Sequence, residues 1–331
     1  MQQRPFKDDR KRRSGLRSVK YLSSRNVYYM ATNAQSGKLG FFDRLRTGWT
    51  LTKDSASVIR THPKLLVFPL LAGLSAVFFL GLIFLPLVLT DVLGLALEYV
   101  VLIVLFFVTT FFSTYFSAAL VYAANEAFHD REPGIRDSLS AVNDRLGAIV
   151  IWSLISATVS MIFRRLEDTP LSGLVGSLFA FGWSIMTFFI VPVLVFEEVT
   201  SKSMFTKSGS VFKETWGETL GAGFGITGII VGTGLVLVAG AIAISAPVSA
   251  VFPGAEITVT VVLVALAVVF TYLLSQTIWG VVKTALYIYA NEGVTPEQFD
   301  NFDFETLDGR SEQKATSGTV SGRESGTSID D

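Results

Sequence analysis

Six long apolar runs, separated by polar links, dominate the hydrophobic pattern of this chain. About 20 consecutive apolar residues span the hydrocarbon core of a bilayer. The run at 146–163 is only just long enough, whereas the other five exceed this length. The pattern therefore predicts an all-α, polytopic fold with six transmembrane helices. The predicted spans are 65–90, 94–124, 146–163, 171–196, 219–246 and 257–288.

The links between the runs alternate in length. Short turns follow the first, third and fifth runs, whereas the links around 125–145 and 197–218 are longer and polar. Each longer link contains a Ser-x-Ser phrase, at 138–140 and 208–210, and a third phrase at 55–57 precedes the first run. Internal similarity at intervals indicates repeated structural units. We expect three hairpins, each preceded by a surface helix, as parallel repeats about an axis along the membrane normal.

The residues before the first run predict an amphipathic helix over 41–62. Its apolar residues recur at steps of three, four or seven, as on one helix face: Phe42, Leu45, Trp49, Ala56 and Ile59. Its basic residues should face outward: Arg44, Arg46, Lys53 and Arg60. A helix with aromatic anchors and basic flanks lies in the headgroup layer of a membrane. His62-Pro63 should end it, because the residue before a proline avoids helical angles.

The composition and charge also indicate a membrane protein. The 331 residues are 50% hydrophobic and 17% charged, whereas a soluble domain carries about 25% charged residues. Of the 27 Lys and Arg residues, only Arg164 and Arg165 fall in the links that follow the first, third and fifth runs. Loops rich in Lys and Arg stay in the cytoplasm. We therefore expect a plasma-membrane protein with cytoplasmic surface helices and cytoplasmic N- and C-termini.

The two ends of the chain carry opposite charge and flank a membrane domain at 41–292. Residues 1–40 are basic, and we expect a disordered tail attracted to anionic lipid headgroups rather than to nucleic acid. Met30 resembles an ordinary start, so translation from Met30 is an alternative. Residues 293–331 are acidic and rich in Ser and Gly, which predicts a second disordered tail. This tail contains either a docking motif for a partner or a weakly ordered exit from the last helix, made by Phe299, Phe302 and Phe304.

A second repeated phrase marks the ends of two runs. Residues 119–126 and 285–292 both end in Ala-Asn-Glu, and the fourth run ends at Glu197. A carboxylate at a helix C-terminus is repelled by the negative end of the helix dipole. We expect cationic residues of the surface helices to pair with these glutamates; alternatively, the glutamates converge as a site for a cation or a lipid headgroup. The residues concerned are Asn125, Glu126, Glu197, Asn291, Glu292, Arg60, Arg145 and Lys213.

Glycines and prolines predict close packing and kinks. One face of the fifth run carries two GxxxG pairs, which favour tight packing against a helix of the same chain or of a second copy. These glycines are Gly221, Gly225, Gly228 and Gly232. Pro69 and Pro192 lie near the ends of the first and fourth runs and should kink them.

The sequence contains no recognisable catalytic site. The absence of Cys excludes thiolate metal ligands and Cys nucleophiles. His62 and His129 are the only histidines, and no zinc-protease, hydrolase or nucleotide-binding motif is present. The centres of the runs lack ionisable residues, which argues against proton relays and ion couplers. We therefore expect no metal ion, no cofactor and no catalytic residue.

Four short segments resemble an uncharacterised family of prokaryotic six-span membrane proteins, a domain of unknown function. They are Gly-Trp-Thr-Leu at 48–51 with Ser55, Leu-Leu-Val-Phe-Pro-Leu at 65–70, Val-Pro-Val-Leu-Val-Phe-Glu at 191–197 and Ala-Leu-Tyr-Ile-Tyr-Ala at 285–290. The resemblance covers about residues 41–292. It implies a multi-pass topology without an assigned activity.

Three functions are consistent with these features. The first is a membrane-organising or scaffold protein that acts through an unidentified membrane or cytoplasmic partner, or as a homo-oligomer. The second is a carrier or channel for an apolar or lipid-like solute, because its spans carry no central charge. The third is a membrane enzyme acting on lipid headgroups, with Glu126, His129 and Glu292 as the residues to test.

Overall fold

The computed structural model describes residues 41–90, 95–167, 176–200, 202–216, 222–251 and 254–299, together with Phe302 and Phe304. The chain divides into two units, Met1–Arg44 and Leu45–Asp331. The second unit contains every described element except the first turn of α2. Within the described ranges all regular structure is helical. The predicted basic tail at 1–40 lies outside the described residues.

Six helical segments are long and apolar enough to cross a membrane. They are Pro63–Ile83, Val100–Phe128, Leu146–Arg164, Ser177–Phe196, Ile226–Ser245 and Glu256–Glu292. Each lies within or close to one of the six predicted runs. An apolar run of this length in lipid must form a helix, because only a helix satisfies all its backbone hydrogen bonds within one segment. The prediction of an all-α, multi-pass membrane protein is therefore confirmed.

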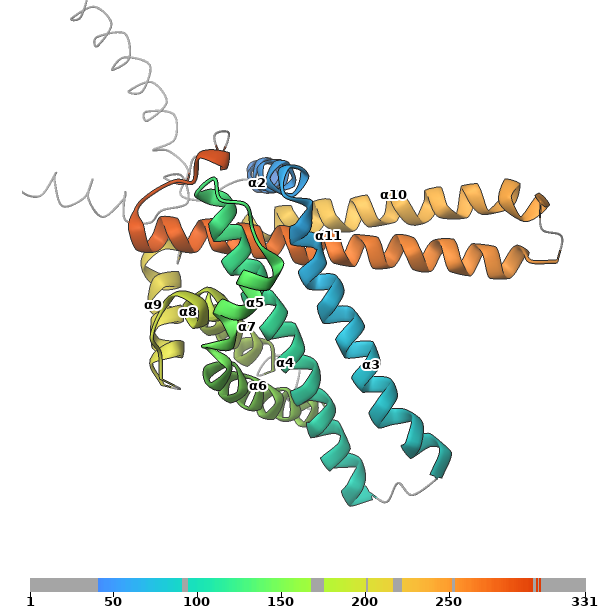
Figure 1. The fold of residues 1–331 in the computed structure, drawn as a ribbon, viewed down its shortest axis with the longest axis horizontal. Helices are drawn as coiled ribbons and strands as arrows, with labels where there is room; N and C mark the ends of the chain where they lie inside the picture. Colours follow the sequence, from blue (N-terminus) through green and yellow to red (C-terminus); the bar gives the residue numbers. More distant parts are fainter. Residues whose placement is uncertain are drawn as a thin grey trace, which may run out of the picture. The chain divides into compact units, whose positions relative to one another are not determined.

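The helices follow the predicted order of surface segments and spans. The first part of the chain forms α2 (Phe41–Thr61), η1 (Pro63–Leu66), α3 (Val67–Thr90) and α4 (Leu95–Phe128). The middle part forms α5 (Ile135–Asn143), α6 (Leu146–Glu167), α7 (Ser177–Thr187), α8 (Ile190–Phe196) and α9 (Ser203–Trp216). The last part forms α10 (Ala222–Val251), α11 (Glu256–Glu292) and η3 (Glu297–Phe299). In Figure 1, α3 lies beside α4, and α10 lies beside α11.

Prolines set two of the helix boundaries. Pro192 has no N–H for the carbonyl four residues earlier, and the fourth span is interrupted there, between the end of α7 at Thr187 and the start of α8 at Ile190. The predicted break at His62-Pro63 is also present, since α2 ends at Thr61. Pro69 lies in the first turn of α3, just after the change from 3₁₀ to α geometry at Val67. The kink expected at Pro69 is thus replaced by a change of helix type.

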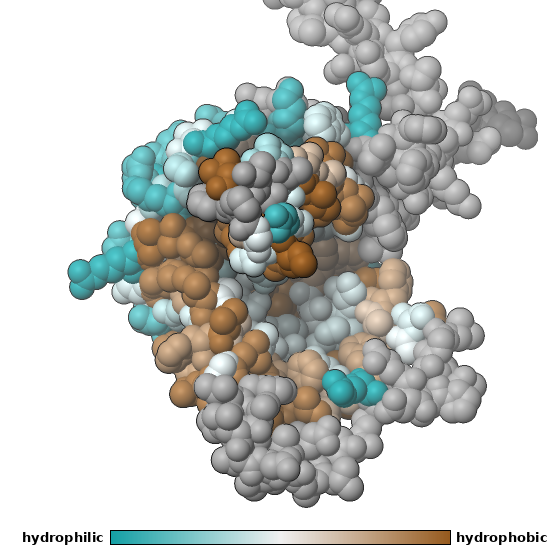
Figure 2. Space-filling model, turned by 90° about the vertical axis from the view of Figure 1, so that its right-hand side faces the viewer, coloured by the Kyte–Doolittle hydropathy of each residue, from teal (hydrophilic) through white to brown (hydrophobic). Residues whose placement is uncertain are grey.

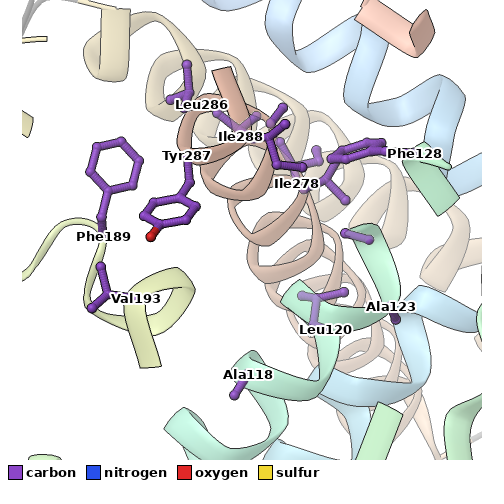
Figure 3. Packing of buried hydrophobic residues seen from close by; sticks show 14 of the residues in the cluster. Ala118, Leu120, Ala123, Phe128, Phe189, Val193, Ile278, Leu286, Tyr287 and Ile288 are labelled. Atoms are coloured by element: carbon purple, nitrogen blue, oxygen red, sulfur yellow. The ribbon is translucent and has the colours of Figure 1, made fainter. Parts of the chain in front are cut away.

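The buried side chains gather at one end of the spans. In α11 they lie between Thr277 and Ala290, and in α4 most lie between Thr114 and Phe128. Phe189, Ile190, Val193 and Leu194 of the fourth span join the same cluster (Figure 3). We call this cluster the span-end core. By contrast, α10 and the first half of α11 expose large apolar side chains, including Leu235, Val236, Ile257 and Leu266.

The lengths of α4 and α11 explain this division. At 1.5 Å per residue, the 37 residues of α11 extend about 55 Å and the 34 residues of α4 about 51 Å. The hydrocarbon core of a bilayer is only about 30 Å thick. The exposed apolar parts therefore match lipid, and the C-terminal parts extend beyond it into the span-end core. Figure 2 looks onto the end of the α10–α11 hairpin, with hydrophilic residues mainly at the upper left and hydrophobic residues below them.

Three short amphipathic helices, α2, α5 and α9, pack around the span-end core, and we call them the surface helices. The face of α2 differs from the predicted one. Trp49 is 58% exposed, whereas Leu51, Ser55 and Val58 are buried. The buried face therefore agrees with the prediction at Ile59, which is 5% exposed, but not at Trp49. The side chains of Phe42 and Leu45 lie outside the described residues.

Candidate functional site

The first serine of each Ser-x-Ser phrase is buried on a surface helix. Ser55 of α2, Ser138 of α5 and Ser208 of α9 are each no more than 1% exposed. Ser208 Oγ accepts a hydrogen bond from the backbone N–H of Phe189 at 3.1 Å, within the break between α7 and α8. Ser138 Oγ donates to the carbonyl of Gly134 at 2.8 Å. The serines thus let the surface helices approach the spans closely, as small hydroxyl residues do in membrane proteins.

Glu197 is the centre of a polar cluster at the end of the fourth span. Its Oε1 accepts a hydrogen bond from the Tyr287 hydroxyl at 2.9 Å and lies 3.1 Å from Lys207 Nζ. The same Nζ donates to Asn291 Oδ1 at 3.4 Å. Tyr287 is only 2% exposed and points from α11 towards Val193 (Figure 3). The cluster thus joins α8, α9 and α11, and we call it the Glu197 cluster.

The charge of Glu197 is stabilised by these contacts. Partial burial of this carboxyl favours its neutral form, but the hydrogen bonds from Lys207 and Tyr287 outweigh burial and hold its pKa below the usual value. A carboxylate at a helix end opposes the helix dipole, so the lysine offsets an unfavourable position. The predicted partner Lys213 lies exposed in the last turn of the same helix. The lysine that pairs with Glu197 is therefore Lys207, not Lys213.

Glu126 pairs within its own span end instead of with a surface helix. Arg131 Nε lies 2.6 Å from Glu126 Oε2, and its second guanidinium nitrogen lies 2.7 Å from Oε1. This bidentate contact replaces the expected pairing with Arg145, which begins the turn into α6. Five residues separate Glu126 from Arg131, and the turn at Asp130, where φ is 55°, brings them together. The exposed Arg60 also has no described contact with a span-end glutamate.

The three span-end glutamates are not joined to one another. Glu292 is exposed next to Gly293, whose positive φ of 71° closes α11. Among the described residues, no hydrogen bond or ion pair links any two of Glu126, Glu197 and Glu292. Asn125 is half-buried, and its backbone carbonyl lies 2.8 Å from His129 Nδ1. No group of three potential metal ligands occurs in the described ranges.

The other surface segments are tied to the spans by further polar contacts. Lys64, which follows α2, pairs with Glu132 at 2.9 Å in the segment after α4. Tyr115 of α4 donates a hydrogen bond to Asn143 Oδ1, at the end of α5, at 2.8 Å. Each surface helix region is therefore attached to a span through a specific side chain.

The C-terminal aromatic segment belongs to the core, contrary to prediction. Phe299, Phe302 and Phe304 are 0%, 7% and 1% exposed. Phe299 packs edge-on against Phe128 of α4 at 5.8 Å, and Phe304 stacks on Tyr289 of α11 at 5.1 Å. The segment is thus neither a free docking motif nor a weakly ordered exit, because its rings cover the ends of α4 and α11.

Two glycines outside the predicted stripe permit close packing within the chain. A methyl group at Gly280 of α11 would lie 2.4 Å from Leu120 Cδ2 of α4, and one at Gly234 of α10 would lie 2.9 Å from Thr271 Cγ2 of α11. Gly232 has no atom within 4 Å of such a methyl group, and Gly228 is exposed. Gly221 lies outside the described residues. In this chain, close helix contact therefore uses Gly234 and Gly280.

These contacts are suited to fastening helices rather than to chemistry. In the Glu197 cluster and at Glu126, each carboxylate is neutralised by a neighbouring cation. A catalytic acid or base instead needs a proton affinity near the working pH. The sequence did not single out Arg131, Lys207 or Tyr287, although the two basic residues lie within ten positions of the glutamates they pair with.

The comparisons with known proteins agree with a membrane protein of unassigned role. The model of DUF6159, described as a family of unknown function, matches residues 96–297. The match includes the resembling segments at 191–197 and 285–290, whereas those at 48–51 and 65–70 precede it. No curated protein matches the chain. No solved structure matches it.

Proposed function

Because the chain belongs to the DUF6159 family of unknown function, we propose its role from its architecture: it is a membrane-organising or scaffold protein. Its working surface is the face formed by the surface helices, which lies in the cytoplasm of a cell whose plasma membrane holds the spans. The observation that carries this proposal is the span-end core. Several helices extend beyond lipid thickness and are held together there by aromatic packing and by the Glu197 cluster.

Three parallel hairpin repeats remain the best account of how this face is built. The burial of Ser55, Ser138 and Ser208 at matching positions on three surface helices supports it. The cytoplasmic orientation is supported by the Lys and Arg distribution, since only Arg164 and Arg165 lie in the links on the opposite side. The basic segment 1–40 would be attracted to anionic headgroups of the same leaflet.

A test for a partner protein needs variants that change the surface and leave the span-end core intact. Truncation after Phe304 removes residues 305–331 and keeps the buried phenylalanines. Charge reversal of exposed Arg136 and Lys202 changes the face without touching the core. We expect a partner that purifies with the full chain in fixed ratio to be lost from one of these variants and kept by Leu235→Ala, at an exposed position of α10. A homogeneous, monomeric chain without any such partner would contradict the scaffold role.

A carrier for an apolar or lipid-like solute is the second candidate. The interruption at Phe188 and Phe189 between α7 and α8 favours it, because broken helices are common at transport sites. Native mass spectrometry separates the two roles. Stoichiometric bound lipid that exchanges between vesicles in the presence of the protein would support a carrier.

The exposed glycines of α10 support a scaffold that acts by self-association. Gly228 and Gly232 face outward from α10. A second copy could approach there closely. Crosslinking in native membranes would give dimers or larger species from the wild type and fewer from Gly232→Leu, whereas equal crosslinking would exclude this contact.

A further inference from the structure

Lys283 is a basic side chain that the ion pairs of the described residues leave without a counter-charge. The three described ion pairs join Lys64 to Glu132, Arg131 to Glu126 and Lys207 to Glu197. Lys283 Nζ instead lies 5.1 Å from the ring centre of Phe188 and 6.0 Å from that of Trp279. The side chain itself is only partly exposed.

The surroundings of Lys283 are aromatic on two sides. Trp279 lies one turn before it on α11, and Phe188 lies at the interruption of the fourth span. Phe188 also packs against Phe212 of α9, at 5.3 Å between ring centres. Aromatic faces attract a cation but carry no net negative charge. A charge that is removed from water without a counter-charge is unfavourable, so these surroundings favour an anion from outside the chain.

The Glu197 cluster does not supply that anion. Tyr287 lies one turn beyond Lys283 and donates to Glu197, whose charge is balanced by Lys207. Lys283 therefore remains the unbalanced cation of this helix face. A lone basic residue at the depth of a span marks a functional site more often than a structural one.

The position of Lys283 along α11 indicates which anion it meets. It lies 26 residues after Ile257, or about 39 Å along the helix axis. If the hydrocarbon core begins near Ile257, it ends about 30 Å later, and the headgroup layer on that side adds about 5–8 Å. Transmembrane helices tilt by about 20° on average, which reduces the length of about 39 Å along the helix to about 37 Å along the membrane normal. Lys283 thus lies at the depth of the lipid phosphates of the leaflet around the span-end core.

We propose that Lys283, between Phe188 and Trp279, binds a phosphate group, supplied either by an anionic lipid headgroup or by a soluble phosphate. The ammonium group donates hydrogen bonds to the phosphate oxygens, and the rings exclude water from one side. Both the scaffold and the carrier can contain such a site, so it does not depend on the role proposed above.

The test uses the full chain, purified in a neutral detergent and stripped of lipid. Thermal unfolding and native mass spectrometry are recorded with phosphatidylglycerol, with phosphatidylcholine and with inorganic phosphate. We expect phosphatidylglycerol to raise the melting temperature of the wild type and to give a discrete adduct. In Lys283→Met the shift should fall by more than half, whereas Lys283→Arg should retain it. Lys213→Met, at an exposed lysine on α9, should retain it as well.

The arms distinguish the two sources of phosphate. If only phosphatidylglycerol raises the melting temperature in a Lys283-dependent way, the bound phosphate belongs to a lipid. If inorganic phosphate also raises it and displaces the lipid adduct, the ligand is a soluble phosphate. An undiminished shift in Lys283→Met, or no shift in the wild type with either anion, overturns the proposal. Lys283→Met should fold without lipid, because it removes an unpaired charge and keeps the length of the side chain. If it does not fold, Lys283→Gln takes its place with the same expected loss.

Discussion

At the scale of residues, single polar contacts hold the ends of apolar helices in place. The Tyr287 hydroxyl is the least exposed member of the Glu197 cluster, and its bond to a carboxylate joins α11 to the end of the fourth span. Hydrogen bonds to charged groups contribute more than neutral ones. A glutamate that is unfavourable for its own helix thereby stabilises the junction of three helices.

Removing this hydroxyl should loosen the junction. Tyr287→Phe keeps the ring against Phe196 and loses the bond to Glu197. We expect the free energy of unfolding to fall by about 1 kcal/mol. This is less than a hydrogen bond to a charged acceptor usually contributes, because Glu197 regains water. Differential scanning fluorimetry should show the melting temperature lowered by about 2–4 °C. Tyr272→Phe on the same helix is the control, because Tyr272 is 48% exposed; equal effects of the two substitutions would contradict this role of Tyr287.

The Glu197 carboxyl should also make stability depend on pH. Its pKa is lower in the folded chain than the ordinary value of 4.5. The stabilisation is therefore complete well above pH 4.5 and is lost as the pH falls through 4.5 towards the folded pKa. We expect the difference in melting temperature between the wild type and Glu197→Gln to be largest at neutral pH and to shrink below about pH 4.5. A difference that grows in acid would contradict this assignment.

At the scale of elements, close approach of α4 and α11 depends on one glycine. Leu120 is 2% exposed and occupies the space that a side chain at Gly280 would need. Both helices bury their C-terminal parts at this crossing and expose their earlier parts. The crossing therefore fixes where the hairpins meet.

A larger residue at this crossing should be poorly tolerated. Gly280→Val forces Leu120 or the helix axes to move, and overpacking of this kind costs about 1–3 kcal/mol. Gly81→Val in α3 is the matched control, because Gly81 is exposed and the space around it is open. Unfolding in increasing concentrations of SDS should show a lower midpoint for Gly280→Val than for the control. A midpoint as high as that of the control would mean that the helices do not meet at Gly280.

Sequence predicted the spans well, because apolar length alone decides what crosses a membrane. It also predicted a surface helix before the first span and one within each longer polar link, where α2, α5 and α9 lie. It could not identify Lys207 or Arg131, since several basic residues lie near each glutamate and the turn at Asp130 decides between them. It pointed to the GxxxG stripe of α10, whereas the crossings described within the chain use Gly234 and Gly280, because a GxxxG pattern does not indicate which helix face meets a neighbour.

At the scale of the whole molecule, the C-terminal aromatic segment extends the membrane domain. The acidic composition after residue 293 predicted a tail, but three phenylalanines bury their rings against the ends of α4 and α11. Three rings in a short polar segment are enough to attach it, because burying a Phe side chain contributes about 1.5–3 kcal/mol.

Two truncations should therefore behave differently. Ending the chain after Phe304 should leave the melting temperature close to that of the full chain. Ending it after Glu292 exposes Phe128 and Tyr289 and should lower both yield and melting temperature. Phe304→Ala in the full chain should cost about 3–5 kcal/mol, measured by SDS unfolding. Equal stability of the two truncated chains would place the phenylalanines outside the folded domain.

The central claim is that all three surface helices lie on one side of the membrane, around span ends that extend beyond the lipid. The chain has no Cys, so single cysteines can be introduced at the exposed positions Ser57, Ser140 and Thr206, with Thr258 at the opposite end of α11. A maleimide that does not cross membranes should label the first three only after the cells are opened. It should label Thr258→Cys in intact cells. Labelling of any one surface helix from the side opposite to the other two would contradict the account.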